Sequence, residues 1–223
     1  MNEFLILIFQ LIVLIFSVMV HEVSHGLVAY KLGDDTAKVM GRLNLNPKNH
    51  LDPFGSFFLP LALFLISKGS FVIGWAKPVP YNPNNLKNPK IGAALIGIAG
   101  PASNLMLAVI FGLFIRLLAP YLNLNSGEVL SGSMTGGLFF ILLLNIVVFV
   151  NILLAIFNLV PIPPLDGSKL LFAALPYKYS GVQKFLEDYG MMVLLFFIFF
   201  GFSLISPIIY GFYSVLVGQW AIL

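Results

Sequence analysis

Long apolar runs separated by polar loops make up most of this 223-residue chain. A membrane-spanning helix needs about 20 mostly apolar residues, and four stretches meet that need: residues 4–30, 91–118, 135–160 and 185–206. An apolar piece follows Pro207 and runs to residue 223; it fits a kinked continuation, an interfacial helix or a short extra span. A fifth run, 54–67, has only about 14 residues and is therefore predicted to be re-entrant or buried.

The loop before the second span has a pattern of its own. Phe71 to Ile73 and Val79 to Tyr81 read as two short strands around a turn rich in Gly and Pro, which predicts a small β-hairpin. Irregular backbone at membrane depth survives only where it lines a protein-enclosed or water-filled cavity. We therefore expect any part of this loop within the membrane to border such a cavity.

Composition agrees with an all-α polytopic membrane protein. The chain is 59% hydrophobic and 9% charged, whereas soluble domains carry roughly 25% charged residues, and its mean hydropathy is +0.98. It has no cysteine, so any metal must be held by His, Asp, Glu or Asn. The net charge of +3 comes from loop lysines and indicates no nucleic-acid surface. Residues 1–3 lack a basic signal-peptide region, so the first apolar run is expected to stay in the mature protein.

The distribution of basic residues predicts the topology. If 54–67 does not cross the membrane, loops 31–90 and 161–184 share one side and contain eleven of the twelve Lys and Arg residues. Only Arg116 then lies toward the other side. The positive-inside rule places both loops in the cytoplasm. A crossing at 54–67 would divide the basic residues much more evenly.

The most informative motif is HEVSH at residues 21–25, directly after the first apolar run. Residues i and i+4 share a helix face, so His21 and His25 can bind one metal. Glu22 lies beside them and is suited to take a proton from a water on that metal. A chance match is disfavoured because the chain has only three histidines. A membrane glutamate also costs about 2.5–3.5 kcal/mol at a helix centre, which favours a functional role.

A catalytic zinc usually takes three protein ligands, and Asp166 is the best candidate for the third. It follows Pro161, Pro163 and Pro164, which cannot continue the preceding helix, so the unwound chain can direct a carboxylate back to the histidines. The alternative is an aspartate that caps a helix or a turn before Gly167. With 54–67 non-spanning, both motifs fall on the same side of the membrane, in agreement with the charge distribution.

Other polar residues have competing interpretations. Asn158 precedes the break and is a candidate donor to the oxyanion of a tetrahedral intermediate. For Asn145 and Asn151 we favour interhelical hydrogen bonds. His50 fits a loop histidine with a structural hydrogen bond better than a partner of the metal site or a proton carrier. The small residues of 99–104 indicate helix packing.

Four motifs together resemble the site-2 protease family of zinc-dependent intramembrane metalloproteases: HEVSH, GWAKPVP at 74–80, AGP at 99–101 and NLVPIPPLDG at 158–167. The resemblance covers about residues 10–175. It implies one zinc per chain, bound by His21, His25 and Asp166. Glu22 would be the general base and Asn158 would assist the transition state. It also implies a three-helix catalytic core (4–30, 91–118 and 135–160) with a membrane-associated β-hairpin beside the cleft.

The chain departs from larger members of that family. Its longest soluble-looking segment is too short for a PDZ domain, and it ends in apolar residues where other members carry cystathionine-β-synthase-type domains. We therefore expect a compact prokaryotic type: one membrane metalloprotease domain over 1–223, with a core at about 4–175 and C-terminal membrane segments at about 185–223. It would lie in the cell membrane, with its site toward the cytoplasm, and cleave transmembrane proteins or peptides.

Two other classes of protein compete with the protease. Intramembrane His and acidic residues also mark the ion pathways of metal transporters, but polar residues concentrate on one side here and no internal repeat is visible. A non-catalytic scaffold derived from a protease is the second alternative, and the intact Glu22 argues against it.

Overall fold

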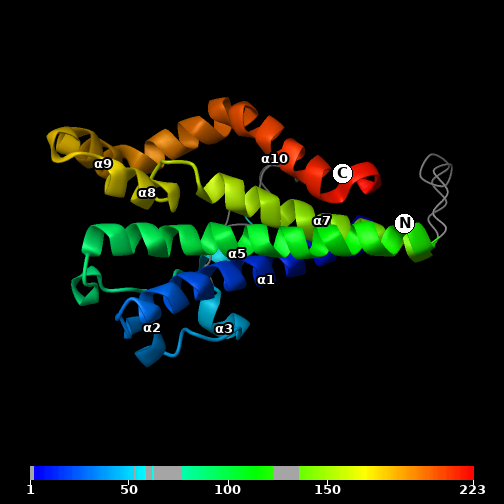
Figure 1. The fold of residues 1–223 in the computed structure, drawn as a ribbon, viewed down its shortest axis with the longest axis horizontal. Coiled ribbons are helices and arrows are strands. Elements are labelled where there is room, and N and C mark those ends of the chain that lie inside the picture. The colour runs from blue at the N-terminus through cyan, green and yellow to red at the C-terminus, as the bar shows by residue number, and fades with distance from the viewer. Residues whose placement is uncertain (1–2, 53, 59–61, 63–76, 123–135) are drawn as a thin grey trace.

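The computed structural model describes residues 3–52, 54–58, 62, 77–122 and 136–223 (Figure 1). Four helical stretches are long and apolar enough to cross a membrane. Three are the single helices α1 (Glu3–Lys31), α5 (Pro89–Leu118) and α7 (Gly136–Asn158). The fourth joins α9 (Ser180–Phe196), the π-helical turn η5 (Phe197–Gly201) and α10 (Phe202–Val217). The protein is therefore a multi-pass membrane protein, and the four predicted spans are confirmed.

Short helices make up most of the connecting structure. They are α2 (Thr36–Val39), α3 (Pro47–His50), η1 (Phe54–Phe58), η2 (Pro83–Asn85), η3 (Ala119–Leu122), α8 (Gly167–Ala174), η4 (Tyr177–Tyr179) and η6 (Gly218–Trp220). The described part of the chain contains no strand.

The predicted β-hairpin and re-entrant run lie largely outside the described residues. Phe71 to Ile73 are not described, and Val79 to Tyr81 belong to no strand within the described ranges. Of the run 54–67, the structure describes the π-helical turn η1 and Ala62. Both elements stay predictions.

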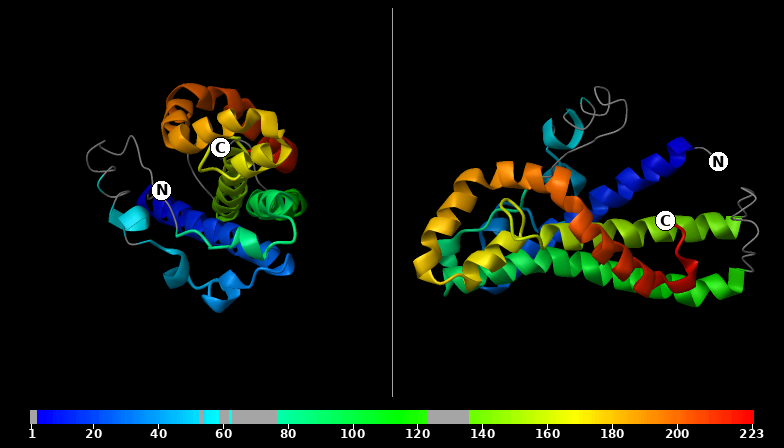
Figure 2. Two further views of the ribbon diagram at one scale, coloured as in Figure 1. Left: turned by 90° about the vertical axis from the view of Figure 1, so that its left-hand side faces the viewer. Right: turned by 90° about the horizontal axis from the view of Figure 1, so that it is seen from above.

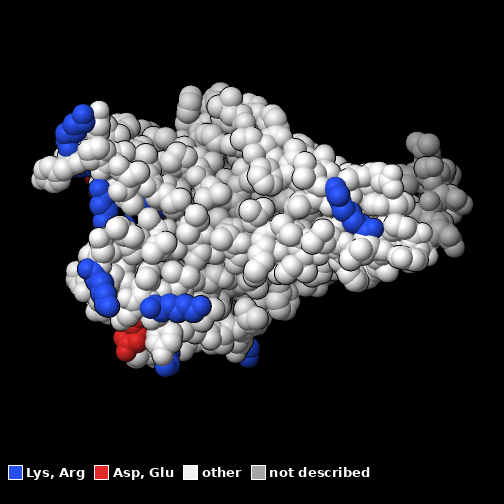
Figure 3. Space-filling model, viewed as in Figure 1, with Lys and Arg blue, Asp and Glu red and all other residues white. Residues whose placement is uncertain are grey.

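The long helices alternate in direction along the chain. In Figure 1, α1 ends and α5 begins at one end of the molecule, and α7 ends and α8 lies there too. The chain between α1 and α5 thus makes no net crossing, which is the arrangement that the basic residues favour. Figure 3 shows most Lys and Arg side chains of the visible face at this same end. α5 lies at the centre, in contact with α1, α7, α8 and α10.

The C-terminal helical stretch is one kinked continuation past Pro207. With η4 and η6 at its two ends it runs through 44 residues, Tyr177–Trp220, about 66 Å if straight, which is twice the roughly 30 Å thickness of a bilayer core. Figures 1 and 2 show that it arches over α7 instead. The π-helical turn η5 lies within the arch, and such turns are common sites of helix bending.

The core joins this arch to the other helices. Buried apolar side chains of α5, α7 and α10 form one cluster, with Ile115, Val148 and Tyr213 among its members. Tyr213 Oη donates to the buried Asn145 Oδ1 of α7. Arg116 of α5 donates from Nε to the Leu216 carbonyl at 2.8 Å, near the end of α10. These polar contacts tie the end of the chain to α5 and α7.

Asp34, after α1, fastens a distant segment to that helix. Its carboxylate is fully buried and accepts hydrogen bonds from the backbone N–H of Asn82 at 2.7 Å and the Asn85 amide at 2.7 Å. Thr36 donates two more, from its N–H and its hydroxyl. Burial on its own raises the pKa of Asp34, but these hydrogen bonds outweigh it and lower the pKa below 3.8. The stretch that leads into α5 is therefore held against the end of α1.

We expect Asp34→Asn to destabilise the protein by about 1–3 kcal/mol at neutral pH, because the amide NH₂ leaves a buried donor without an acceptor. The pKa is lower in the folded state, so the stabilisation is complete above the unfolded pKa of about 4 and is lost as pH falls through the folded pKa. Thermal unfolding in detergent should show a difference between wild type and variant at pH 7 that shrinks below pH 4. Asp35→Asn, at the exposed neighbour, is the matched control.

Candidate metal centre

The two histidines of the HEVSH motif lie on one face of α1, as their spacing predicts. Both side chains are buried, and their rings meet edge to face with centroids 4.6 Å apart. Donor atoms of His21, Glu22 and His25 all lie within 4.8 Å of one another. A continuous helix thus gathers two imidazoles and a carboxylate at a single place.

Asp166 completes the group from the other side. α7 ends at Asn158, and the proline-rich stretch leads the chain back to α8. A Cβ on Gly167 would lie 2.2 Å from the Leu159 carbonyl oxygen, so only glycine permits this return. Asp166 Oδ2 lies 3.0 Å from His21 Nε2 and 3.1 Å from His25 Nε2. Its side chain makes no capping hydrogen bond to α8, which disfavours the helix-cap alternative.

α5 fixes the orientation of both imidazoles. His25 Nδ1 lies 2.6 Å from the Ile96 carbonyl oxygen, which can only accept, so this nitrogen carries the proton. His21 Nδ1 lies 2.6 Å from Asn104 Oδ1. The Asn104 amide nitrogen donates to the Ser17 carbonyl, so its oxygen faces His21 and accepts in turn. When it is neutral, each ring therefore directs the lone pair of its Nε2 at Asp166.

This donor set fits a zinc ion. One carboxylate oxygen of Asp166 lies within 3.1 Å of an imidazole nitrogen from each histidine, and such lone-pair donors repel one another unless a cation or proton lies between them. Ligand atoms around a tetrahedral zinc with bonds of about 2.0–2.2 Å stand roughly 3.3–3.6 Å apart, only slightly wider than the separations here. His₂Asp is also a common kind of set for a catalytic zinc, which keeps a further position open.

Lys169 is an additional charge at the site. Its Nζ lies 2.8 Å from Asp166 Oδ1, the carboxylate oxygen that faces away from the histidines. Burial would raise the pKa of Asp166, but the hydrogen bonds that His21 and His25 donate when their rings are protonated, together with the charge of Lys169, outweigh it and hold the pKa below its usual range. The carboxyl group is thus ionised, as a metal ligand must be.

The carboxylate of Glu22 is held from outside the helix. The Val79 N–H donates to Glu22 Oε2 at 2.9 Å. A Cβ on Gly26, one turn further along α1, would lie 2.7 Å from Val79 Cγ1. The segment around Val79 therefore rests directly on α1, and its amide orients the predicted general base.

The remaining predicted residues have different surroundings. Asn158 donates to the Leu154 carbonyl of its own helix, and its oxyanion role stays a prediction. Asn145 and Asn151 make the expected interhelical hydrogen bonds, to Tyr213 of α10 and Asn104 of α5. His50 is buried and its Nε2 lies 2.6 Å from the Asn44 carbonyl, in agreement with a structural loop histidine.

Sequence reasoning missed the contribution of α5 to the site. The stretch 99–104 was predicted to serve packing alone, yet Asn104 holds His21 and Gly100 faces both rings. A Cβ on Gly100 would lie 2.5 Å from His21 Nε2 and 2.6 Å from His25 Cε1. The available signal was a buried amide within an apolar span, which is costly without a partner.

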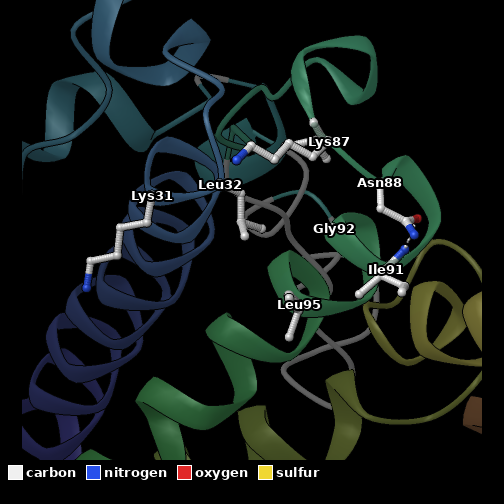
Figure 4. A pocket seen from close by; sticks show the side chains of 8 residues that line it. Lys31, Leu32, Lys87, Asn88, Ile91, Gly92 and Leu95 are labelled. Carbon is white, nitrogen blue, oxygen red and sulfur yellow. Dashed lines mark hydrogen bonds between the residues drawn. The ribbon is translucent and has the colours of Figure 1, made fainter.

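A separate pocket lies between the end of α1 and the start of α5. It has a volume of about 260 Å³, and Figure 4 shows Leu32, Ile91 and Leu95 among its lining residues, with Lys87 above them. Asn88 closes its edge by accepting a hydrogen bond from the Ile91 N–H. None of the four predicted residues of the metal centre lines this pocket.

Comparisons with known proteins agree with the geometry. The family described as peptidase family M50 matches residues 9–201. The Bacillus subtilis protein YwhC, a zinc metalloprotease by name, is 41% identical over 188 residues, which cover 84% of this chain and 78% of YwhC. The Rip2 proteins of Mycolicibacterium smegmatis and Mycobacterium tuberculosis, also named as zinc metalloproteases, are 29% identical; this chain matches 51% and 61% of their lengths.

No solved structure shows significant similarity to the chain. The family match covers most of the chain, and it falls on a multi-pass membrane protein whose buried donors suit zinc. The chain therefore belongs to peptidase family M50, the site-2 protease family, and is a zinc metalloprotease.

Proposed function

We propose that this protease hydrolyses peptide bonds within or near the transmembrane segments of membrane proteins. One observation carries the proposal: Asp166, in the turn after the spanning helix α7, meets His21 and His25 beside Glu22 on α1, a helix long enough to cross a bilayer. Membership of a peptidase family favours the protease over the transporter and the scaffold. The basic residues at the end of the molecule nearest these groups support a site toward the cytoplasmic side of the cell membrane.

His21, His25 and Asp166 would hold one zinc ion. When bound, zinc polarises the scissile carbonyl and acidifies a water molecule. Glu22 accepts the proton of the attacking water and then delivers it to the leaving amine. The Val79 N–H holds one oxygen of Glu22, so the carboxylate is already oriented before substrate arrives. Asn158, the last residue of α7, would donate to the developing oxyanion.

The substrate must present an extended backbone to this site. Helical peptide bonds are enclosed by their own hydrogen bonds, so a transmembrane substrate has to unwind locally. The predicted hairpin of residues 71–81 would pair with the unwound stretch by β-strand addition. Water would reach the site, and the cleaved ends would leave it, from the cytoplasmic side, where loops 31–90 and 161–184 are predicted to lie.

Removal of the metal tests the proposal directly. Wild-type protein in liposomes should cleave a single-span substrate within its apolar segment, stop after chelation and recover when zinc returns. Mass spectrometry of the products locates the cut. Cleavage confined to soluble tails would contradict the intramembrane site, and metal flux without any cleavage would support a transporter.

The ligand set calls for a second measurement. We expect about one zinc per chain in detergent-purified wild type, because one three-donor set is present. His25→Ala and Asp166→Ala should each lose most of this zinc, since each removes one of three ligands. Asp188→Ala, at an exposed acidic residue of α9, should keep it. Wild-type zinc affinity in Asp166→Ala would place the third ligand elsewhere.

A further inference from the structure

A buried polar chain connects the metal centre to the middle of the helix bundle. Asn104 on α5 donates from Nδ2 to Asn151 Oδ1 on α7 at 2.8 Å and to the Ser17 carbonyl on α1 at 3.2 Å. Asn151 Nδ2 donates to the Ser17 hydroxyl and to the Val147 carbonyl, both at 2.9 Å. Ser17 and both asparagines are buried. Three membrane helices therefore share one hydrogen-bond network.

The network has a single direction. The Val147 carbonyl can only accept, so the nitrogen of the Asn151 amide faces it and the oxygen faces Asn104. This oxygen and the Ser17 carbonyl both require the Asn104 nitrogen, which leaves the Asn104 oxygen for His21 Nδ1. Each member fixes the orientation of the next, and the series ends with a proton on His21 Nδ1.

A flipped Asn104 amide would disturb its contacts with His21, Ser17 and Asn151. Its oxygen would face the Ser17 carbonyl and Asn151 Oδ1, two acceptors that cannot donate to it. Its NH₂ group would face His21 Nδ1 and move the ring proton to Nε2, the atom that lies 3.0 Å from Asp166. That proton would block the nitrogen needed to bind a metal. Burial makes the flip more costly, because no water can satisfy the misplaced groups.

We propose that Asn104 and Asn151 are positioning residues of the metal centre: Asn104 keeps the His21 Nε2 lone pair toward the metal, and Asn151 prevents the Asn104 amide from flipping. The inference rests on the proposed ligand set. It extends the site to α7 at a residue that touches none of the ligands. Partners that orient a metal-binding histidine typically change metal affinity by 10–100-fold when they are removed.

Asn145 provides a matched control on the same helix. Like Asn151 it is fully buried and donates to the carbonyl four residues earlier, here Ile141 at 2.9 Å. Its oxygen accepts from Tyr213 of α10 and has no link to Asn104. Asn145→Leu thus removes a comparable buried amide and leaves the network at His21 intact.

The first experiment reads the ring protons without metal. The chain has three histidines, so selective ¹⁵N-histidine labelling gives three assignable rings. At a pH where all are neutral, zinc-free wild type should carry its proton on Nδ1 in His21 and His25. His50, which faces the Asn44 carbonyl through Nε2, should show the opposite tautomer and report correct folding.

Substitution should change the tautomer of His21 selectively. Asn104→Leu removes the acceptor of Nδ1, so His21 should become a mixture of tautomers while His25 and His50 keep their signals. Asn151→Leu should produce a smaller admixture of the Nε2 tautomer, and Asn145→Leu none. An unchanged His21 signal in both Asn104→Leu and Asn151→Leu overturns the proposal. If Asn104→Leu does not fold, Asn151→Leu decides alone.

The second experiment measures zinc affinity by competition with a chelator. Asn104→Leu should weaken binding by roughly 10–100-fold, Asn151→Leu by a smaller factor, and Asn145→Leu by none. Equal affinities in all three variants contradict the proposal. Failure of the protease function is distinguishable, because a wild type that binds zinc and obeys this order without cutting membrane substrates keeps the network and loses only the proposed substrate class.

Discussion

Glu22→Gln is expected to abolish peptide hydrolysis while the protein keeps its zinc. A glutamine cannot take a proton from the attacking water, and loss of a general base typically lowers the rate by roughly 10²–10⁴-fold. The side chain has almost the same shape, and its amide oxygen can still accept from the Val79 N–H that binds Glu22 Oε2. Initial rates of substrate cleavage in liposomes, together with zinc per chain, provide the measurement.

Cleavage rate and zinc content together distinguish loss of the general base from loss of the folded site. His21 and His25 flank Glu22 in sequence, so a variant that disturbed the helix would lose zinc and activity together. We expect lost activity with unchanged zinc and an unchanged unfolding temperature. Cleavage at more than a tenth of the wild-type rate would remove Glu22 from the role of general base and direct the search to another proton acceptor near the histidines.

Gly100→Ala adds only one methyl group, yet we expect it to reduce zinc affinity and activity strongly. The added Cβ would lie 2.5–2.6 Å from the rings of His21 and His25. Neither ring can move aside freely, since Asn104 and the Ile96 carbonyl hold them by hydrogen bonds of 2.6 Å. The rings or α5 must shift, and displacement of reacting groups by about 1 Å costs on the order of 10²-fold in rate. We expect lower zinc affinity and a comparable loss of activity.

The sign of this effect opposes helix propensity. Alanine is favoured over glycine in a helix interior by about 1 kcal/mol, so the same change at a glycine with free space should be neutral or stabilising. Gly211 of α10 is such a position, with no atom within 4 Å of its added Cβ. Gly211→Ala should therefore keep full activity and zinc. Equal zinc affinity in Gly100→Ala and Gly211→Ala would show that the rings tolerate the contact.

Local sequence predicted the spans and the metal-binding motif because both depend on short-range spacing. A long run of apolar residues predicts a membrane helix whatever its neighbours in the fold are. Positions 21 and 25 share a face in any α-helix. Asp166 followed from the prolines that stop α7 and from the requirement that both motifs lie on one side of the membrane. The open choice after Pro207 had a different origin, because a proline permits either a kink or an end of a helix.

The partners that hold these groups depended on tertiary contacts that no periodicity encodes. His21 meets Asn104 across 83 positions of sequence, and Glu22 meets Val79 across 57. Val79 is a β-branched residue, a type common in strands. Its N–H nevertheless donates to the Glu22 carboxylate, and Val79 belongs to no strand. The small residues of α5 predicted close packing correctly, but sequence did not reveal that the surface packed against them is the pair of imidazoles.

The position of Asp166 along the chain also bears on how the protein is made. His21 and Asp166 are separated by 145 positions, and ribosomes add about 5–20 residues per second, so roughly 7–30 s pass between their syntheses. Throughout that interval the first span carries two of the proposed donors and its glutamate, but no third ligand. With Asp166 as the proposed third ligand, a nascent chain should be catalytically silent beside the other proteins entering the membrane and should gain its activity only once α5 and α7 have packed against α1.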